Sequence, residues 1–292
     1  MKLEQLYGCN FHYTRHTLDY FIDCMKKHDI HFIEFYAATP HFHVDDYTAE
    51  EAKEIKKKFD AADIKVKVIT AEQCLYPISM VSPDPVARER SLRYYEKTLE
   101  LGNAVGSDAF QVMGGFPSPG QDPKEVEDLM YKGLYRVCEK AKQYGMKVIL
   151  EADVTSAVRG CQEIKDVINT LKHPNLTGMI DFGALWDDYH DFEKGVKILG
   201  DDLYHIHINN VKGKAHCHPV YHGDIDCNSW FEILDKYNYQ GGLSPELWGF
   251  QYVHKADEVF AKTIDFYKDY LNNANKNGIA PTSVYTIDGD TK

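Results

Sequence analysis

Four side chains that can bind a cation stand at the ends of four successive predicted strands. They are Glu151 in VILEAD, Asp181 in GMIDFG, His207 in HIHI and Glu246 in SPELW. Three carboxylates gathered at one point repel one another and raise one another's pKa values, and a divalent cation removes that repulsion. Because three oxygen ligands and one imidazole suit a hard ion, the set predicts Mn²⁺, or alternatively Mg²⁺ or Co²⁺, rather than structural zinc.

The segment 203–208, LYHIHI, carries two histidines inside one predicted strand. Residues two apart on a strand point to the same face, so His205 and His207 point the same way. If His207 at the end of the strand binds the ion, His205 lies one layer deeper. We expect His205 to support the ligands by hydrogen bonding rather than to bind the ion itself.

Loops that follow the predicted strands supply candidates for contacting a substrate. Any one of these side chains has an ordinary alternative as a loop or core residue, and Glu34 at the end of the second strand is equally open between pocket and structure. The candidates are Lys212, His216, His41, Glu72, Trp248 and Phe116.

Short apolar segments of strand length alternate with longer segments of helical periodicity along the chain. Strands are expected at 6–13, 31–37, 65–70, 109–113, 147–151, 176–181, 203–208 and 242–247. Helices are expected at 18–28, 48–62, 85–105, 123–144, 162–171, 192–199, 228–237 and 256–275. Eight such units without a linker rich in Gly, Ser or Pro predict an α/β protein, a (β/α)₈ TIM barrel. The strands of such a barrel end at one face, which would bring the four candidate ligands together.

An open, doubly wound sheet is the alternative arrangement of the same units. It would favour a glycine-rich turn after the first strand, but residues 12–17 read HYTRHT and contain no glycine. A dinucleotide site at this turn is therefore not predicted. We expect residues 1–277 to form a single barrel domain. The tail 278–292 lies outside the repeat and is either disordered or packed against a partner.

Charge and composition exclude several classes of partner. The 292 residues include 33 Lys and Arg against 45 Asp and Glu, a net charge of −12, which argues against nucleic-acid binding. No apolar segment reaches the roughly 18 residues that a membrane span needs, and the first residues lack a secretory apolar core. Seven cysteines without a CxxC pair indicate reduced thiols, so we expect a cytoplasmic protein.

Taken together, the motifs at 148–153, 179–183, 205–208 and 245–248 resemble those of the xylose-isomerase-like barrel superfamily of sugar isomerases and epimerases. The segments 31–41 and 71–108 resemble its fructoselysine 3-epimerase-like and ketose 3-epimerase-like members. The resemblance implies a divalent-metal-dependent isomerase or epimerase that abstracts a proton next to a keto-sugar carbonyl through a metal-bound cis-enediolate. Glu151 and Glu246 would be acid and base, and Asp181 and His207 ligands only. Nucleases of the same superfamily need more histidines and a basic groove, which the net charge opposes.

Three positions depart from the ketose 3-epimerase pattern. Ala184, Gly213 and Ala157 stand where those enzymes carry a histidine, an arginine and a glutamate that hold the outer hydroxyls of the sugar. Their absence argues against a free ketohexose as substrate and fits a sugar conjugate.

The large subunits of C-glycoside-deglycosylating lyases also resemble this barrel, and they are the alternative. They cleave a 3-keto-C-glycoside by the same metal-assisted proton abstraction. The resemblance then implies a small β-rich second subunit. The tail and an aromatic-rich chain, with 20 Tyr and 14 Phe, favour this alternative. Under either hypothesis we expect an oligomer.

Overall fold

Eight parallel strands form the centre of the computed structural model, which describes residues 1–74, 78–188, 191–248 and 251–274. The strands follow the chain in the order β1-β2-β3-β4-β5-β6-β7-β10. Their bounds are Gly8–Cys9, Phe32–Ala37, Lys65–Ala71, Ala109–Met113, Lys147–Glu151, Leu176–Asp181, Leu203–Ile208 and Gly242–Pro245. A parallel bridge between Leu6 and Leu243 joins the first and last strands, so the sheet closes nearly completely. The predicted TIM barrel is confirmed; the proposed tail 278–292 lies outside the described residues.

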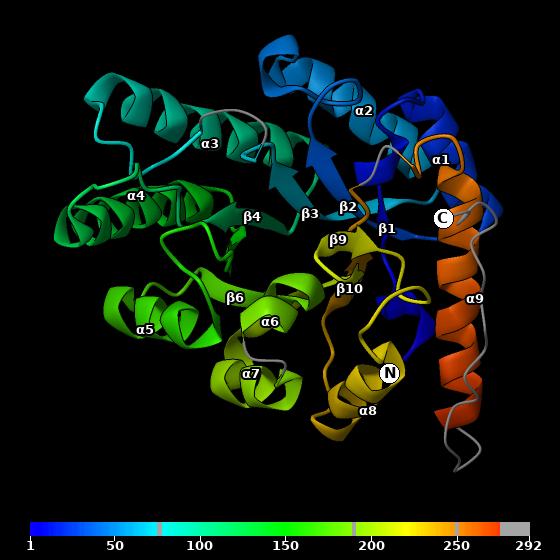
Figure 1. Ribbon diagram of the computed structural model, residues 1–292. Coiled ribbons are helices and arrows are strands. Elements are labelled where there is room, and N and C mark those ends of the chain that lie inside the picture. Colours follow the sequence, from blue (N-terminus) through cyan, green and yellow to red (C-terminus); the bar gives the residue numbers. More distant parts are fainter. Residues whose placement is uncertain (75–77, 189–190, 249–250, 275–292) are drawn as a thin grey trace.

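Helices surround the strands and cover their outer faces (Figure 1). The helices are α1 to α9, with bounds Leu18–Lys27, Ala49–Ala61, Pro85–Val105, Pro123–Gln143, Cys161–Leu171, Phe182–Asp188, Phe192–Leu199, Cys227–Lys236 and Ala256–Ala274. The predicted helix starts are confirmed where a capping residue marked them. Thr48 and Glu51 form a reciprocal capping box, and the carboxylates of Asp84 and Asp122 accept backbone N–H groups ahead of a proline in the first turn. No helix in the described part of the chain is long and apolar enough to cross a membrane.

The first strand is shorter than its sequence predicts. A strand was expected over 6–13, but pairing covers Gly8–Cys9, and a 3₁₀ helix occupies Phe11–Tyr13. The side chain of Asn10 explains the early end. Its Oδ1 accepts the backbone N–H of Tyr36 at 2.7 Å and its Nδ2 donates to the Tyr36 carbonyl at 3.2 Å. Because the side-chain amide replaces backbone pairing with β2, the main chain is free to turn.

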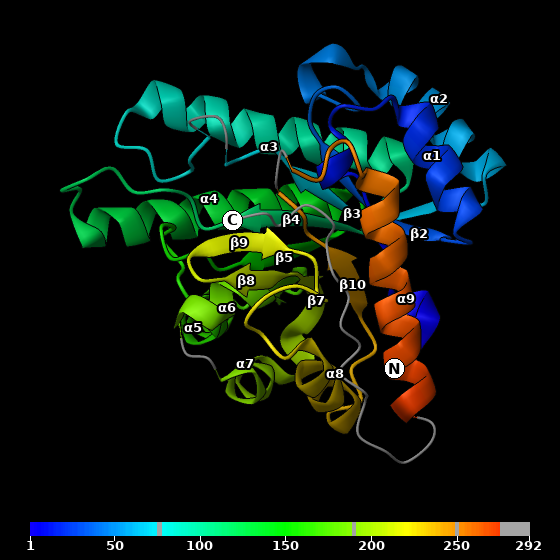
Figure 2. The same ribbon diagram turned by 45° about the vertical axis from the view of Figure 1, so that its right-hand side comes forward.

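Two elements near the candidate ligands were not expected from the sequence. The helix α6 begins directly after β6, where Oδ1 of Asp181 accepts the backbone N–H of Ala184 at 2.6 Å. A hairpin of β8 (Asn210–Lys212) and β9 (Ala215–His218) follows β7, and Gly213 turns it with a φ of +63°. Figure 2 shows the hairpin beside α6. The predicted substrate candidates Lys212 and His216 therefore lie on a hairpin at the end of the barrel where β7 terminates.

The barrel interior changes character along its axis. A lower layer is apolar and consists of Val68, Ala109, Ile149 and Met179, with Tyr204 packed against it. Above this layer the interior is polar and buried. The polar side chains, from six different strands, are Glu34, Thr70, Gln111, Glu151, His205, His207 and Ser244. Buried polar groups need partners, so these residues must form a hydrogen-bonded or ion-binding network.

Candidate metal centre

The four predicted ligands meet at the C-terminal ends of their strands. One ligand atom from each of Glu151, Asp181, His207 and Glu246 lies within 4.8 Å of all the others. Parallel pairing sets this arrangement, since Asp181 on β6 is the direct partner of His207 on β7. Glu246 follows the end of β10, and its backbone N–H donates to the carbonyl of Ile208 on β7 at 3.2 Å. Neighbouring strands thus deliver all four side chains to one point.

The ring nitrogen Nδ1 of His207 faces the carboxylates. It lies 3.2 Å from Oε1 of Glu151 and 3.5 Å from Oε2 of Glu246. Neither contact has hydrogen-bond geometry, and this buried nitrogen has no hydrogen-bond partner among the described residues. A buried imidazole nitrogen surrounded by three carboxylates is the donor set that a divalent cation would satisfy. The residues present therefore fit a hard metal ion.

Burial and neighbouring groups shift the pKa values of the three carboxylates in different directions. Burial raises the pKa of Glu151 to about 7, with His207 opposing the shift. Burial, then Glu246 and Glu151, raise the pKa of Asp181 well above its ordinary value. Burial also pushes the pKa of Glu246 upward, but His207 and the indole of Trp248 outweigh it and leave that pKa lowered. Such opposite shifts in one cluster are typical of functional sites.

Each carboxylate is oriented by a donor from a neighbouring strand or loop. The amide of Gln111 donates to Oε2 of Glu151, and Oε1 of Gln111 accepts from Gln73 at 2.9 Å. Nδ2 of Asn209 donates to Oδ2 of Asp181 at 2.6 Å and lies 3.4 Å from Oε2 of Glu246. Trp248 Nε1 donates to the other oxygen of Glu246 at 2.8 Å. These contacts restrict how the carboxylates can turn, which pre-organises the site.

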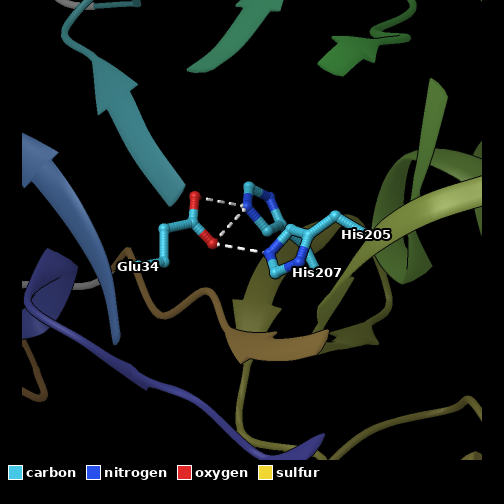
Figure 3. A group of neighbouring side chains, drawn as sticks. All are labelled: Glu34, His205 and His207. Carbon is cyan, nitrogen blue, oxygen red and sulfur yellow. Dashed lines mark hydrogen bonds and ion pairs between the residues drawn. The ribbon is translucent and has the colours of Figure 1, made fainter. Parts of the chain in front are cut away.

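Glu34 reaches the opposite edge of the His207 ring (Figure 3). His207 Nε2 lies 2.9 Å from Oε1 and 3.1 Å from Oε2 of Glu34, and His205 Nε2 lies 2.8 Å from Oε2. Burial would raise the pKa of Glu34, but His207 and His205 outweigh it and hold that pKa well below its usual range. His205 lies one layer below His207, contacts Glu34 and is not in the carboxylate group, which is the placement expected of a supporting residue.

Two of the predicted substrate contacts lie beside the carboxylates. Trp248 touches Glu246 directly and packs on Phe11 and Tyr36, with ring centroids 5.2 Å and 5.1 Å away. His216 is brought in by the hairpin. Its Nδ1 lies 3.1 Å from the position a Cβ would take at Gly183, a point 3.3 Å from Oδ1 of Asp181.

The other predicted contacts have different surroundings. Both ring nitrogens of His41 are engaged, by Asn10 at 2.9 Å and by the carbonyl of His16 at 2.9 Å. Lys212 is exposed on the hairpin, and its Nζ lies 2.9 Å from Nε2 of His222, which follows the hairpin. Glu72 is buried and accepts the backbone N–H of Cys74 at 2.8 Å. Contact between these side chains and a substrate stays a prediction.

Phe116 lines a cavity of about 540 Å³ that also includes Gln73, Cys74, Arg90 and Thr155. Gln73 connects this cavity to Glu151 through Gln111. At this volume the cavity is large enough for a sugar substituent.

Sequence reasoning missed the supporting residues Gln111 and Asn209 and left the role of Glu34 open. A signal was present for two of them. Gln111 is the polar residue in the apolar segment AFQVM, and Asn209 follows His207 at a spacing of two, which continues the same face of the strand. The contact of Glu34 with His205 and His207 joins residues separated by more than half of the chain, and no local pattern reveals it.

Comparison with known proteins agrees with the fold. Fructoselysine 3-epimerase of Escherichia coli O157:H7 is 23% identical over 191 residues, covering 64% of this chain and 70% of the relative. The structure of a D-tagatose 3-epimerase-like protein matches with a TM-score of 0.76 and 17% identity, over 93% of this chain and 98% of the other. The structure of 3-keto-D-glucoside 4-epimerase from E. coli matches with a TM-score of 0.71 and 16% identity, over 89% and 98% of the two chains. Residues 22–270 match the model of the xylose isomerase-like TIM barrel family, and the chain belongs to this family.

Proposed function

We propose that this protein is a divalent-metal-dependent epimerase or isomerase of keto sugars or their conjugates. The observation that carries the proposal is the meeting of Glu151, Asp181, His207 and Glu246, with ligand atoms within 4.8 Å of one another. The relatives named above include a fructoselysine 3-epimerase and a 3-keto-D-glucoside 4-epimerase, whose names specify epimerisation of keto sugars. Mn²⁺ is the proposed ion, with Mg²⁺ or Co²⁺ as alternatives.

When bound, the ion would polarise a carbonyl as a Lewis acid and make the proton on the adjacent carbon more acidic. Glu151, Asp181, His207 and Glu246 would hold it. Glu151 ends β5 and Glu246 follows β10, and they contact His207 Nδ1 separately, at 3.2 Å and 3.5 Å. Two carboxylates placed in this way can serve the two proton transfers of an epimerisation, one removing a proton and the other returning one on the other face.

The surroundings of the two glutamates support this division of labour. The Glu151 side chain is 5% exposed and that of Glu246 is 16% exposed. Water therefore has little access to the proton that either carboxylate would carry. The amide of Gln111 and the indole of Trp248 each hold one oxygen, which leaves the other oxygen directed at the centre of the cluster. Restricted carboxylates in a nearly dry site favour a defined direction of proton transfer.

Deuterium wash-in from heavy water tests the proposal. The purified chain with Mn²⁺ would be incubated with a panel of free ketoses, ketose conjugates and 3-keto-glycosides, and exchange at the carbon next to the carbonyl would be followed by NMR. We expect exchange with at least one class, lost by about 10²- to 10⁴-fold in Glu151→Gln and Glu246→Gln. Glu54→Gln, an exposed carboxylate on α2, is the matched control that keeps full exchange.

The same panel separates the epimerase from the lyase. Exchange and inversion on a ketose or ketose conjugate favour the epimerase. Release of an aglycone from a 3-keto-C-glycoside, dependent on a small added second subunit, favours the lyase and would replace the proposed activity. Absence of exchange on every substrate in the presence of each of the three ions would contradict both.

A further inference from the structure

We propose that Glu34 is a positioning residue that keeps the ring proton of His207 on Nε2 and so leaves Nδ1 available to bind the ion. This inference rests on the proposed function, because it concerns the same metal centre. Glu34 comes from β2 and meets two residues of β7 inside the barrel, at the edge of His207 away from the carboxylates (Figure 3).

The contacts of Glu34 are those of a carboxylate that only accepts. Its two oxygens lie 2.9 Å and 3.1 Å from His207 Nε2, and Oε2 lies 2.8 Å from His205 Nε2. The hydroxyl of Thr70 donates to Oε1. Glu34 is 0% exposed, so water does not compete. Since an ionised carboxylate has no hydrogen to give, both imidazoles must present Nε2–H to it.

The hydrogen on Nε2 determines what the opposite edge of the His207 ring, at Nδ1, can bind. A neutral imidazole has one ring N–H, so a hydrogen on Nε2 leaves a lone pair on Nδ1. The atom Nδ1 faces Glu151 and Glu246, at 3.2 Å and 3.5 Å. A carboxylate behind a metal-binding imidazole is a general device for fixing the ring and raising its strength as a ligand.

The substitution Glu34→Gln keeps the shape and changes this hydrogen-bond pattern. The introduced amide offers one acceptor oxygen and one donor nitrogen, so one of the two imidazoles must accept through Nε2 and carry its hydrogen on Nδ1. For His205 this is unfavourable, because its Nδ1 is buried and has no hydrogen-bond partner among the described residues. For His207 the hydrogen on Nδ1 would face two carboxylates. His207 is therefore the imidazole whose ring hydrogen moves from Nε2 to Nδ1, and Nδ1 is the atom that must bind the ion.

Titration calorimetry with Mn²⁺ on the full chain tests the proposal directly. We expect Glu34→Gln to bind Mn²⁺ about 10- to 100-fold more weakly than the wild type. Thr70→Val is the matched control. It removes a hydrogen bond from the same carboxylate without changing the acceptor, and should stay within a few-fold of wild-type affinity. Thermal unfolding of each variant reports whether the barrel is intact.

A second substitution distinguishes proton placement from a general structural effect. His205→Gln can turn its amide oxygen toward the amide introduced at position 34, which frees that amide's own oxygen for Nε2–H of His207. The double variant Glu34→Gln/His205→Gln should therefore bind Mn²⁺ as tightly as His205→Gln alone. If Glu34 served only the packing of the core, the two losses would add.

Several results would overturn the inference. Wild-type affinity in Glu34→Gln would do so, as would additive losses in the double variant. Two Mn²⁺ per wild-type chain, one of them lost on Glu34→Gln, would show that Glu34, His205 and His207 hold an ion of their own. Failure of the wild type to bind Mn²⁺, Mg²⁺ or Co²⁺ would remove the proposed function together with the inference. If the wild type binds metal and exchanges deuterium, and Glu34→Gln binds Mn²⁺ with the same affinity, only the inference is contradicted and the proposed function stands.

Discussion

The indole N–H of Trp248 donates to Oε1 of Glu246 at 2.8 Å, from a position two residues further along the chain. Glu246 is the most exposed of the four candidate ligands, and this contact holds the oxygen that does not face His207. The aromatic ring of Trp248 is held in turn by Phe11 and Tyr36. Trp248, which the sequence offered as a candidate substrate contact, therefore orients a carboxylate of the candidate metal site.

Trp248→Phe should separate these two roles. The substitution keeps an aromatic ring against Phe11 and Tyr36 and removes only the donor to Glu246. Because the carboxylate is then free to turn, we expect a loss of about tenfold or more in deuterium exchange, with an unchanged unfolding temperature. Steady-state exchange rates and a thermal melt check this. Full exchange activity in Trp248→Phe would show that the hydrogen bond does not matter for Glu246.

Removal and return of the ion should change stability as well as activity. A ligand that binds only the folded state stabilises it by about 2.7 kcal/mol when present at 100 times its Kd. We expect Mn²⁺ to raise the unfolding temperature of chelator-treated protein, and to have no such effect on Asp181→Asn, which retains the shape of the side chain but lacks its negative charge. Differential scanning calorimetry with and without Mn²⁺ measures the shift. An equal shift in both proteins would place the ion elsewhere.

Gly183 lies where a side chain would collide with the supporting network. A Cβ at this position would be 2.8 Å from Oδ1 of Asn209 and 3.1 Å from Nδ1 of His216. His216 is exposed, whereas Asn209 is fully buried and donates to Asp181. Gly183→Ala should therefore displace Asn209, weaken Mn²⁺ binding about tenfold and leave the outer helices intact. Calorimetric titration and circular dichroism test this, and unaltered Mn²⁺ affinity would argue against the tight packing of Asn209.

His12 should make the barrel sensitive to acid. Burial lowers the pKa of His12 to about 3, and the backbone of Ala256 offsets only part of that shift. The unfolded chain takes up this proton near pH 6.5, whereas the folded chain resists it until about pH 3. The contribution of His12 to stability is therefore complete above pH 6.5 and is lost as the pH falls from 6.5 toward 3.

Replacing His12 by an apolar residue of similar size removes this dependence. Between pH 6.5 and pH 5 the wild type should lose about 2 kcal/mol more unfolding free energy than His12→Phe, at about 1.4 kcal/mol for each pH unit. Urea unfolding at a series of pH values gives both slopes. His12→Leu serves as a second variant, since the ring at position 12 packs near Tyr13 and Phe260. Parallel slopes for wild type and variants would contradict the assignment.

The fold was accessible from the sequence because its signals are local. Apolar segments of strand length and capping residues such as Thr48, Asp84 and Asp122 each mark an element within a few residues. Where a side chain substituted for backbone pairing, as Asn10 does toward Tyr36, the strand boundary was misplaced. No periodicity distinguishes an asparagine that pairs like a backbone group from one that simply ends a strand.

The four candidate ligands were identifiable for a different reason: in a parallel barrel the end of each strand lies at the same face, so position along a strand fixes height along the axis. Which groups meet across the barrel depends instead on closure, which brings Glu34 of β2 against His205 and His207 of β7 and lets the hairpin deliver His216 beside Asp181. The sequence therefore contained the types of the candidate ligands and their level along the barrel axis. Their partners, the ring edge each imidazole presents and the charge each carboxylate keeps arise from contacts between residues far apart in the chain, which form only when the barrel has closed and water has left its interior.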